Sequence, residues 1–481
     1  MIPLPLSEII HTTKSALLSA SHPVHPAPAC RSGVRITDIS TDSRTVKAGS
    51  LFIAIKGNNL DGHDFIADVI KKKATAIILS KIPKNLPRQH QTTLLKVTDT
   101  VKAYGDIARY YRSRLKAKVI VVGGSNGKTT TKEMIAHILG KQYSVVKSPK
   151  SFNNFIGVPY TILLADHNTD FLVVEIGTNH PGEISYLAEI AKPDIAVITN
   201  ISEEHLEGLK SLKGVLKEEA CLFKYLRKNN TAIFDASTNS LKRLTKSADY
   251  NIVTFGLSIG AEYTGQAVKV KTGSIEFVIK ARNRNYSCSL PVLGSWNARN
   301  ALTAFAATNH AGINPKKICS ALADFKLPGM RMEKHLVNGV TFINDAYNAN
   351  PISVNLLLND FSSMPARMTN ANRSGGATPK RKVFIFGEMG ELGASSQKYH
   401  REAAKHIARS RIDICIMVGQ ATRWTALALR DFRQHKILSF YYDNVQEFIK
   451  SSNKIISQGD TVLLKGSRTN SLEKIIQCYS I

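Results

Sequence analysis

The sequence predicts an α/β fold built from three domains. Apolar runs of strand length alternate with helical segments through most of the chain, which is typical of mostly parallel sheets covered by helices. The length of 481 residues exceeds one ordinary core and, at roughly 150 residues per domain, suggests about three domains. We expect a small α/β domain at residues 1–97, a central parallel-sheet P-loop domain at 98–327, and a Rossmann-like α/β domain at 328–481.

The amino-terminal part mixes short strands and short helices. The expected elements are a strand at 50–55, a helix at 65–70 and a strand at 76–79. The segment 101–115 follows two prolines and is predicted to be a helix that leads into the next domain. The first boundary is therefore placed near Val97.

The central part alternates apolar strands with helical segments. Residues 250–290 instead alternate polar and β-prone residues, which predicts antiparallel strands added to the sheet. The alanine-rich segment 297–307 is predicted to be a closely packed helix. The parallel strands are expected at 119–122, 171–175, 195–199 and 231–234.

The carboxyl-terminal part begins after a linker at Leu327–Gly329. A third α/β unit follows, and the polar, glycine-containing stretch 364–379 is predicted to be a surface loop within it. Its strands are expected at 341–344, 383–386, 414–418 and 461–464.

The most informative stretch is Val119–Thr131 (Val-Ile-Val-Val-Gly-Gly-Ser-Asn-Gly-Lys-Thr-Thr-Thr). A buried strand delivers the chain to a turn whose backbone N–H groups can face an anion, and the following helix adds its positive dipole end. Lys128 would neutralise terminal phosphates, and Thr129 would ligate Mg²⁺. The loop is shorter than the common P-loop, because Val122 stands where that loop has its first glycine. The predicted nucleotide contacts are Gly124, Ser125, Asn126, Gly127, Lys128, Thr129 and Thr130.

Polar side chains follow other strands and the linker. Glu175 ends an apolar strand, where it would either meet a metal held beside Thr129 or cap a loop or pair with a lysine. His205 follows another strand, and a lone histidine in such a place is more often a structural hydrogen-bond partner than a ligand. Arg331 and Asp345 follow the linker, and they would contact phosphate and ribose or form surface ion pairs.

The composition is basic, with 64 Lys and Arg against 37 Asp and Glu and a formal net charge of +27. The basic residues are dispersed, and no basic helix or aromatic-studded basic strand is present in the sequence. A solvated surface that also attracts anionic substrates is therefore favoured, and we expect no nucleic-acid partner.

The six cysteines lie far apart without a Cys-x-x-Cys pair, so neither a zinc site nor a disulfide framework is predicted. The amino-terminal residues lack the basic and apolar regions of a signal peptide, and no segment approaches the roughly 18 apolar residues of a membrane span. We expect a reduced cytoplasmic protein that has no integral membrane segment and acts as a monomer.

Taken together, the motifs resemble those of the Mur ligases over nearly the whole chain. The short spacing of Gly124–Thr130 is similar to the family's ATP loop. Asn344–Pro351 (Asn-Asp-Ala-Tyr-Asn-Ala-Asn-Pro) looks like the members that add D-alanyl-D-alanine and is the most discriminating motif. The further matching segments are 41–44, 49–57 and 61–65, which look like the family's UDP-sugar domain, and 152–159, 178–183 and 331–333, which look like the D-alanyl-D-alanine-adding members.

The resemblance implies a cytosolic enzyme of peptidoglycan synthesis that uses ATP and Mg²⁺. It would join D-alanyl-D-alanine to a UDP-N-acetylmuramoyl-tripeptide and so form the pentapeptide precursor. A carboxylate is a poor acyl donor, so transfer of the γ-phosphoryl group creates an acyl phosphate that an amine can attack. Positioning and neutralisation of charge in that step would be the task of Lys128, Mg²⁺ and Arg331.

The resemblance also assigns site residues. The implied metal ligands are Thr129, Glu175, His205 and Glu219, of which His205 is also placed with Lys128 and Arg331 in the catalytic set. Asn297 and Asn300 match positions near the adenine, and Asp345 matches a ribose contact. The implied substrate residues are Thr41, Ser43 and Arg44 in the UDP-sugar site, Asn153 and Asn154 on the path of the peptide, and Asn348 and Asn350 in the discriminating motif.

One position departs from the family pattern. Glu219 stands where most members carry a lysine that is carbamylated and shares the second Mg²⁺. A carbamate is a carboxylate on a long arm, so we hypothesise that Glu219 keeps its charge with a shorter reach. A one-step shift to Glu218, or a weakened second metal site, is the alternative.

Other functions fit parts of the sequence. A sibling ligase that adds another amino acid shares the ATP core, as does a folylpolyglutamate-type ligase, although the UDP-sugar-like segment argues against the latter. A catalytically impaired nucleotide-binding relative is suggested by Glu219 alone. The residues that together argue against it are Lys128, Thr129, Glu175, His205 and Arg331. Salt-dependent DNA binding with DNA-stimulated hydrolysis would instead indicate a nucleic-acid-dependent ATPase.

Overall fold

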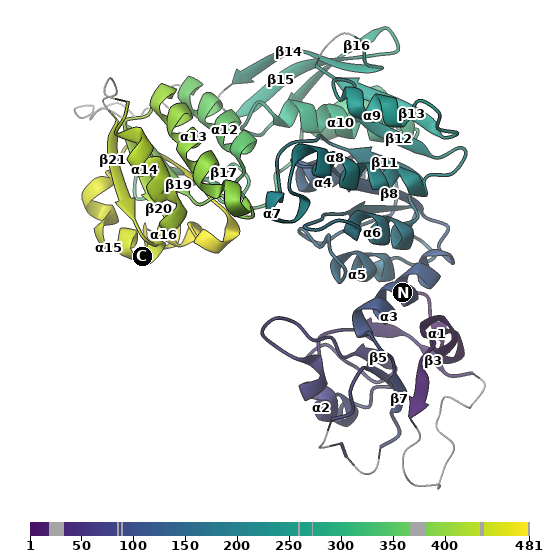
Figure 1. Ribbon diagram of the computed structural model, residues 1–481. Helices are drawn as coiled ribbons and strands as arrows, with labels where there is room; N and C mark the ends of the chain where they lie inside the picture. The colour runs from purple at the N-terminus through teal and green to yellow at the C-terminus, as the bar shows by residue number, and fades with distance from the viewer. Residues whose placement is uncertain are drawn as a thin grey trace.

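The structure, a computed structural model, describes residues 1–18, 33–83, 86–87, 90–257, 260–271, 273–364, 381–432 and 437–479. Three main sheets follow one another along the chain, and the central sheet lies between the other two (Figure 1). The predicted α/β class is confirmed by this architecture. Each main sheet falls within one of the predicted domains, whose exact limits stay a prediction. The loop predicted at 364–379 lies, except for Met364, outside the described residues.

The amino-terminal sheet has the order β2-β7-β6-β5-β4, and all neighbours in it are parallel except β2 and β7. A separate pair, β1 with β3, is antiparallel. The strands are β1 Leu4–Pro5, β2 Ala16–Leu18, β3 Arg35–Ile36, β4 Asp38–Ser40, β5 Ser50–Ile53, β6 Ala76–Leu79 and β7 Thr93–Lys96. The helices are α1 Leu6–Thr13, the 3-10 turn η2 Gly62–Phe65 and α2 Ile66–Lys71.

The central sheet has nine strands in the order β16-β15-β14-β13-β12-β11-β8-β10-β9. Strands β8 to β13 are parallel, and β14 to β16 add the predicted antiparallel extension. The strands are β8 Lys118–Gly123, β9 Val145–Lys147, β10 Phe171–Glu175, β11 Ile195–Ile198, β12 Thr231–Asp235, β13 Asn251–Gly256, β14 Tyr263–Lys271, β15 Ser274–Ala281 and β16 Arg284–Leu290. The helices are α3 Thr100–Arg112, α4 Lys128–Leu139, α5 Gly157–Leu164, α6 Glu183–Ala191, α7 Leu206–Leu209, α8 Leu212–Glu219, η3 Ala220–Tyr225, α9 Asn239–Leu244, α10 Asn297–His310 and α11 Pro315–Leu322.

The carboxyl-terminal sheet has the order β17-β18-β22-β19-β20-β21, with only β17 antiparallel to its neighbour among the described pairs. Its strands are β17 Glu333–Val337, β18 Val340–Asp345, β19 Lys382–Gly387, β20 Ile414–Val418, β21 Leu438–Tyr442 and β22 Thr461–Lys465. The helices are α12 Pro351–Ser363, η4 Gly393–Ser395, α13 Ser396–Arg409, η5 Gln420–Thr422, α14 Arg423–Leu429, α15 Val445–Ile455, η6 Arg468–Asn470 and α16 Glu473–Tyr479.

Both faces of the central sheet are buried. Along β8, Val119 and Val121 enter one core cluster, whereas Ile120 and Val122 enter another, as the two-residue period of a strand requires. The first cluster continues into the amino-terminal domain, where Ile2 N–H donates to the Tyr111 hydroxyl on α3 over 2.6 Å. The amino-terminal and central domains therefore share apolar packing across α3.

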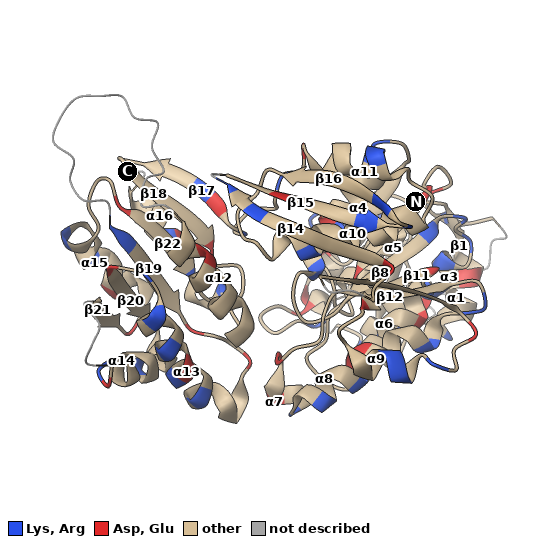
Figure 2. Ribbon diagram, turned by 90° about the horizontal axis from the view of Figure 1, so that it is seen from above, with Lys and Arg blue, Asp and Glu red and all other residues tan. Residues whose placement is uncertain are grey.

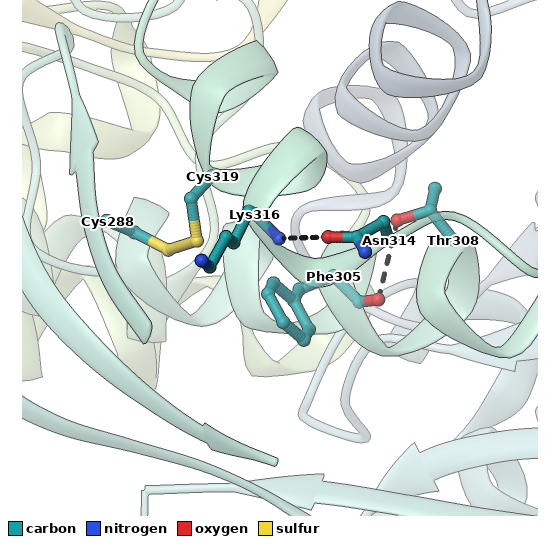
Figure 3. Close-up of a disulfide and its surroundings, with 6 residues drawn as sticks. All are labelled: Cys288, Phe305, Thr308, Asn314, Lys316 and Cys319. Atoms are coloured by element: carbon teal, nitrogen blue, oxygen red, sulfur yellow. Dashed lines mark hydrogen bonds between the residues drawn. A yellow bond between two sulfur atoms is a disulfide. The ribbon is translucent and has the colours of Figure 1, made fainter. Parts of the chain in front are cut away.

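One cysteine prediction was wrong. Cys288 on β16 and Cys319 on α11 are joined by a disulfide, with 5.0 Å between their Cα atoms (Figure 3). The two cysteines are 31 residues apart in the sequence, and their meeting depends on α11 packing against β16. Spacing along the chain cannot reveal that packing.

The structure also bears on the predicted dispersal of basic residues and on the predicted absence of a membrane-spanning segment. In the central and carboxyl-terminal domains, lysines and arginines are spread over many helices and strands and are interspersed with aspartates and glutamates (Figure 2). None of the helices in the described ranges has both the length and the apolar character needed to cross a membrane.

Candidate active site

The turn after β8 requires glycine at two positions where other residues pack directly against its backbone. Gly124 has a φ of 106°, and a Cβ there would lie 2.5 Å from Thr199 Oγ1. Gly127 has a φ of 81°, and a Cβ there would collide with the Asn300 amide. Substitution at either glycine is therefore strained as well as crowded.

The turn is held by the segment that follows β11. Ser125 N–H donates to Asn200 O over 2.9 Å, and Ser202 N–H donates to Ser125 Oγ over 2.8 Å. Thr199 Oγ1 donates to Asn126 O over 2.7 Å. The other N–H groups of the turn are also engaged, because Gly124 N–H donates to Glu219 Oε2 over 2.7 Å and Asn126 N–H donates to Asn200 Oδ1 over 3.1 Å. An anion at this loop would therefore chiefly meet the N-terminal end of α4, which begins at Lys128.

The turn opens into a cavity of about 1590 Å³ between the central and carboxyl-terminal domains. Most of the predicted site residues line it: Ser125, Asn126, Gly127, Lys128, Thr129, Thr130, Asn153, Asn154, Glu175, His205, Asn297, Asn300, Arg331, Asp345, Asn348 and Asn350. Gly124 and Glu219 lie directly behind them, since Gly124 N–H donates to Glu219 Oε2 over 2.7 Å.

The predicted UDP-sugar residues are not among the residues that line this cavity. Thr41, Ser43 and Arg44 lie between β4 and β5 of the amino-terminal domain. Arg44 pairs with its neighbour Asp42 over 2.7 Å. The structure therefore does not bring this group to the phosphate loop, and its role stays a prediction.

Three glutamates are buried around Lys128. Glu175 is 1% exposed, Glu204 is 5% exposed and Glu219 is 1% exposed. One oxygen of each, Oε2 of Glu175, Oε1 of Glu204 and Oε1 of Glu219, is buried without a hydrogen-bond partner among the described residues. Because buried carboxylate oxygens are normally partnered, this arrangement favours a cation at the site.

The ammonium group of Lys128 compensates part of the negative charge of these glutamates. Its Nζ donates to Gly124 O over 2.5 Å and lies 3.5 Å from Glu204 Oε2. Burial acts to lower the pKa of Lys128, but the charges of Glu204, Glu219 and Glu175 outweigh it and raise the pKa above its ordinary value. The lysine therefore stays charged and available to phosphate oxygens.

Glu219 has a perturbed acidity. Burial raises the pKa of its carboxyl from 4.5 to about 7, although the charge of Lys128 opposes the shift. The neighbouring Glu218 faces elsewhere, because its oxygens accept from Gly182 N–H and Ile184 N–H, each over 2.8 Å, at the start of α6. Glu219, rather than Glu218, is the carboxylate beside the phosphate loop.

Glu175 and Thr129 meet as the strand-end pattern suggested. Thr129 Oγ1 donates to Glu175 Oε1 over 3.1 Å, and Asn153 Nδ2 donates to the same oxygen over 3.0 Å. Arg331 reaches across the cavity, and its guanidinium donates to Thr129 Oγ1 over 2.9 Å. The guanidinium also lies 4.3 Å from the centre of the Tyr347 ring.

His205 lies where the two domains touch. It has a φ of 49°, its Nδ1 is 2.5 Å from Glu391 Oε2 of the carboxyl-terminal domain, and its Nε2 is 3.6 Å from Glu204 Oε2. The adjacent imidazole of His205 lowers the pKa of Glu391 below its ordinary value, against the opposing effect of burial. Asn350 Nδ2 donates to Asn126 Oδ1 over 2.6 Å, so a second contact ties this domain to the phosphate loop.

Asp345 and the adenine-side asparagines already have partners. Asp345 Oδ2 accepts from Lys465 Nζ over 2.6 Å, and Oδ1 accepts from Met332 N–H over 3.1 Å. Asn297 Nδ2 donates to Leu293 O over 2.8 Å, and Asn300 Nδ2 donates to Asn297 Oδ1 over 2.9 Å. Their contacts with a nucleotide stay predictions.

Sequence reasoning did not single out some residues that the structure places here. Glu204 directly precedes His205, and an acidic residue so close to the end of a strand could have been predicted as part of the site. Glu391 and Lys465 lie in segments 387–393 and 465–468 of the carboxyl-terminal domain, which the family resemblance places near the incoming D-alanyl-D-alanine. Their contacts with His205 and Asp345 are revealed only by the folded arrangement. In the described part of the chain, no three His, Cys, Asp or Glu side chains are arranged to hold a metal ion alone. A metal here would need further ligands such as nucleotide phosphates, which is usual for Mg²⁺.

Comparison with known proteins finds matches over most of the chain. The Mur ligase family catalytic domain matches residues 35–112, the Mur ligase middle domain 122–308, and the Mur ligase glutamate ligase domain 330–468. The UDP-N-acetylmuramoyl-tripeptide–D-alanyl-D-alanine ligase of Bacillus subtilis is 32% identical over 444 residues, which are 92% of this chain and 93% of the relative.

Solved structures share the fold. The crystal structure of MurF from Acinetobacter baumannii is 26% identical, with a TM-score of 0.85 over 99% of both chains. MurF ligase from Thermotoga maritima in complex with ADP is 24% identical, with a TM-score of 0.79 over 94% of this chain and 98% of that one.

The raised pKa of Glu219 predicts a pH effect on the stability of the ligand-free chain. Between pH 4.5, the ordinary pKa, and about 7 the folded chain holds a proton that the unfolded chain has lost, so this group makes stability fall as pH rises. Glu219→Gln should remove that part of the decline and raise the thermal midpoint at pH 8 more than at pH 5. Thermal unfolding at both values measures it, with the partly exposed Glu276→Gln as control. An equal change at both pH values would refute this reading.

Proposed function

The chain belongs to the Mur ligase family, and we propose that it joins D-alanyl-D-alanine to the terminal carboxylate of a UDP-N-acetylmuramoyl-tripeptide while ATP is converted to ADP and phosphate. The end-to-end likeness to ligases named for this reaction carries the proposal. The product is the pentapeptide precursor of peptidoglycan. A cytoplasmic location and a monomeric state stay predictions.

The phosphoryl step depends on positive charge from both sides of the cavity. Transfer of the γ-phosphoryl group to the tripeptide carboxylate breaks the bond to ADP and forms an acyl phosphate. Lys128 on the central domain and Arg331 on the carboxyl-terminal domain both reach this region, where they would neutralise the oxygens of the transferring group. The amine of D-alanyl-D-alanine then attacks the acyl carbon, and phosphate leaves.

The residues present fit a divalent cation. Buried carboxylates supply the hard oxygen donors that Mg²⁺ prefers. Glu219 lies beside the phosphate loop and has an unpartnered Oε1, whereas the unpartnered Oε2 of Glu175 lies 3.6 Å from Lys132 Nζ and its Oε1 is on the Thr129 side. The residues that would hold it are Thr129, Glu175, His205 and Glu219. When bound, Mg²⁺ neutralises charge on the phosphate oxygens.

The predicted substrate residues are divided between the cavity and the amino-terminal domain. Asn297, Asn300 and Asp345 would contact the adenosine part of ATP, and Thr41, Ser43 and Arg44 would hold the UDP-sugar. Asn153 and Asn154 would line the path of the peptide, and Asn348 and Asn350 would lie beside the reacting groups.

We further propose that Glu219 takes the place of the carbamylated lysine of its relatives. Its Oε2 accepts from Gly124 N–H, while its Oε1 is buried without a partner and faces the same charged cluster as Lys128. A carboxylate fixed in this way needs no carbon dioxide for its formation.

The reaction has a direct test. Phosphate release is followed with ATP, Mg²⁺ and UDP-N-acetylmuramoyl-tripeptide, with and without D-alanyl-D-alanine, and the product is identified by mass. We expect sustained release only with both substrates, together with the pentapeptide. Release with another amino acid in place of the dipeptide would indicate a sibling ligase, and DNA-stimulated release without either substrate would refute the proposal.

The Glu219 proposal predicts independence from carbon dioxide. Activity should be the same in carbon dioxide-depleted and bicarbonate-supplemented buffer, whereas Glu219→Ala should lose roughly 10- to 100-fold in activity because a cation ligand is gone. Glu219→Lys serves as the matched control, since any activity it retains should rise with bicarbonate. Full activity of Glu219→Ala would show that the second metal site is not used.

A further inference from the structure

A second lysine of helix α4 is buried beneath the phosphate loop. Lys132 lies one turn beyond Lys128 and is 0% exposed. Lysine is almost never fully buried unless it is paired, because removing its charge from water costs several kcal/mol. No part of the reaction described above uses this residue.

The ammonium group of Lys132 has four oxygen neighbours. It donates to Ser148 O over 2.7 Å and to Lys150 O over 2.5 Å. It also lies 3.0 Å from Glu133 Oε1 and 3.6 Å from Glu175 Oε2. The lysine therefore joins α4, the end of β10 and the turn at 148–151.

The two oxygens of the Glu175 carboxylate have different surroundings. Oε2 has no hydrogen-bond partner among the described residues, so the nearby ammonium is its main compensation. Oε1 accepts from Thr129 and Asn153, and it faces the cavity side. A cation behind Oε2 holds the carboxylate in one orientation and keeps Oε1 on the Thr129 side, where a metal would replace one of its present hydrogen bonds.

The same ammonium fixes the turn that leads to the peptide wall. Ser148 Oγ accepts from Glu175 N–H over 2.9 Å, and Ser151 Oγ lies 3.1 Å from Thr129 Oγ1. Asn153 and Asn154 follow directly and line the cavity. Movement of the Lys132 side chain would therefore disturb the nucleotide side and the peptide side together.

We propose that Lys132 is a positioning residue that orients Glu175 toward the metal–nucleotide site and couples that site to the peptide-binding turn. The proposal rests on the function proposed above. It gives Lys132 a role distinct from Lys128, which lies at the phosphate loop, whereas Lys132 acts only through Glu175 and the 148–151 turn.

The test compares Lys132→Met, which keeps the length of the side chain, with Lys141→Met. Lys141 follows the same helix but pairs with Asp324 over 2.5 Å at its far end. ADP binding is measured by calorimetry with and without Mg²⁺, together with the thermal midpoint. We expect Lys132→Met to reduce the Mg²⁺-dependent gain in ADP affinity by roughly tenfold or more, as loss of a ligand's supporting partner does elsewhere, and Lys141→Met to leave it unchanged.

A double variant separates positioning from simple support of the fold. Lys132→Met combined with Glu175→Gln removes both charges of the Lys132–Glu175 pair, and Glu133 keeps its ion pair with Lys147. This variant should therefore fold even if Lys132→Met alone does not. We expect it to bind Mg²⁺ and ADP no worse than Glu175→Gln alone. A further tenfold loss in the double variant, or a Lys132→Met protein that is less stable yet keeps the full Mg²⁺ effect, would overturn the proposal.

Measurement of enzyme turnover distinguishes the Lys132 proposal from the proposed ligase reaction on which it rests. Lys132→Met should raise the KM for the tripeptide, because the peptide-binding turn is released, and should also lower kcat. If the parent chain shows the Mg²⁺ effect on ADP but forms no pentapeptide, the proposed reaction fails while the positioning role stands.

Discussion

The site depends on a cluster of buried charges behind the phosphate loop. Glu175, Glu204 and Glu219 bring negative charge into the interior, and Lys128 and Lys132 supply positive charge from successive turns of one helix. Buried ions are costly unless paired, so each position in the cluster constrains the others. The parallel strands make the cluster possible, because the carboxyl ends of β8, β10 and β11 lie at the same sheet edge.

The cluster is completed from outside the central domain. Arg331 reaches Thr129, Glu391 reaches His205, and Asn350 reaches Asn126, all from residues beyond the Leu327–Gly329 linker. Residues on both sides of the cavity therefore belong to one site. A charged ligand bound in the cavity would therefore affect the contacts between the central and carboxyl-terminal domains as well as the phosphate loop.

Local patterns made much of this predictable. The apolar run before Gly124 and the following lysine and threonines are adjacent in sequence, so strand, turn and helix could be inferred together. Glu175 was found because an acid at the end of a buried strand needs a partner. Long-range contacts were not predictable in this way: the hydrogen bond of Glu219 to Gly124 spans 95 residues. The burial of Lys132 was equally hidden, since its carbonyl partners come from a turn with no distinctive composition.

The central claim is that the buried glutamates form a cation site with the phosphate loop. Crystals grown with Mn²⁺ and a non-hydrolysable ATP analogue would locate the metal by its anomalous scattering. We expect Mn²⁺ in contact with the nucleotide phosphates and Glu175 or Thr129, with a second signal beside Glu219. Mn²⁺ held by phosphates and water alone, with all three glutamates in the contacts described here, would contradict the account.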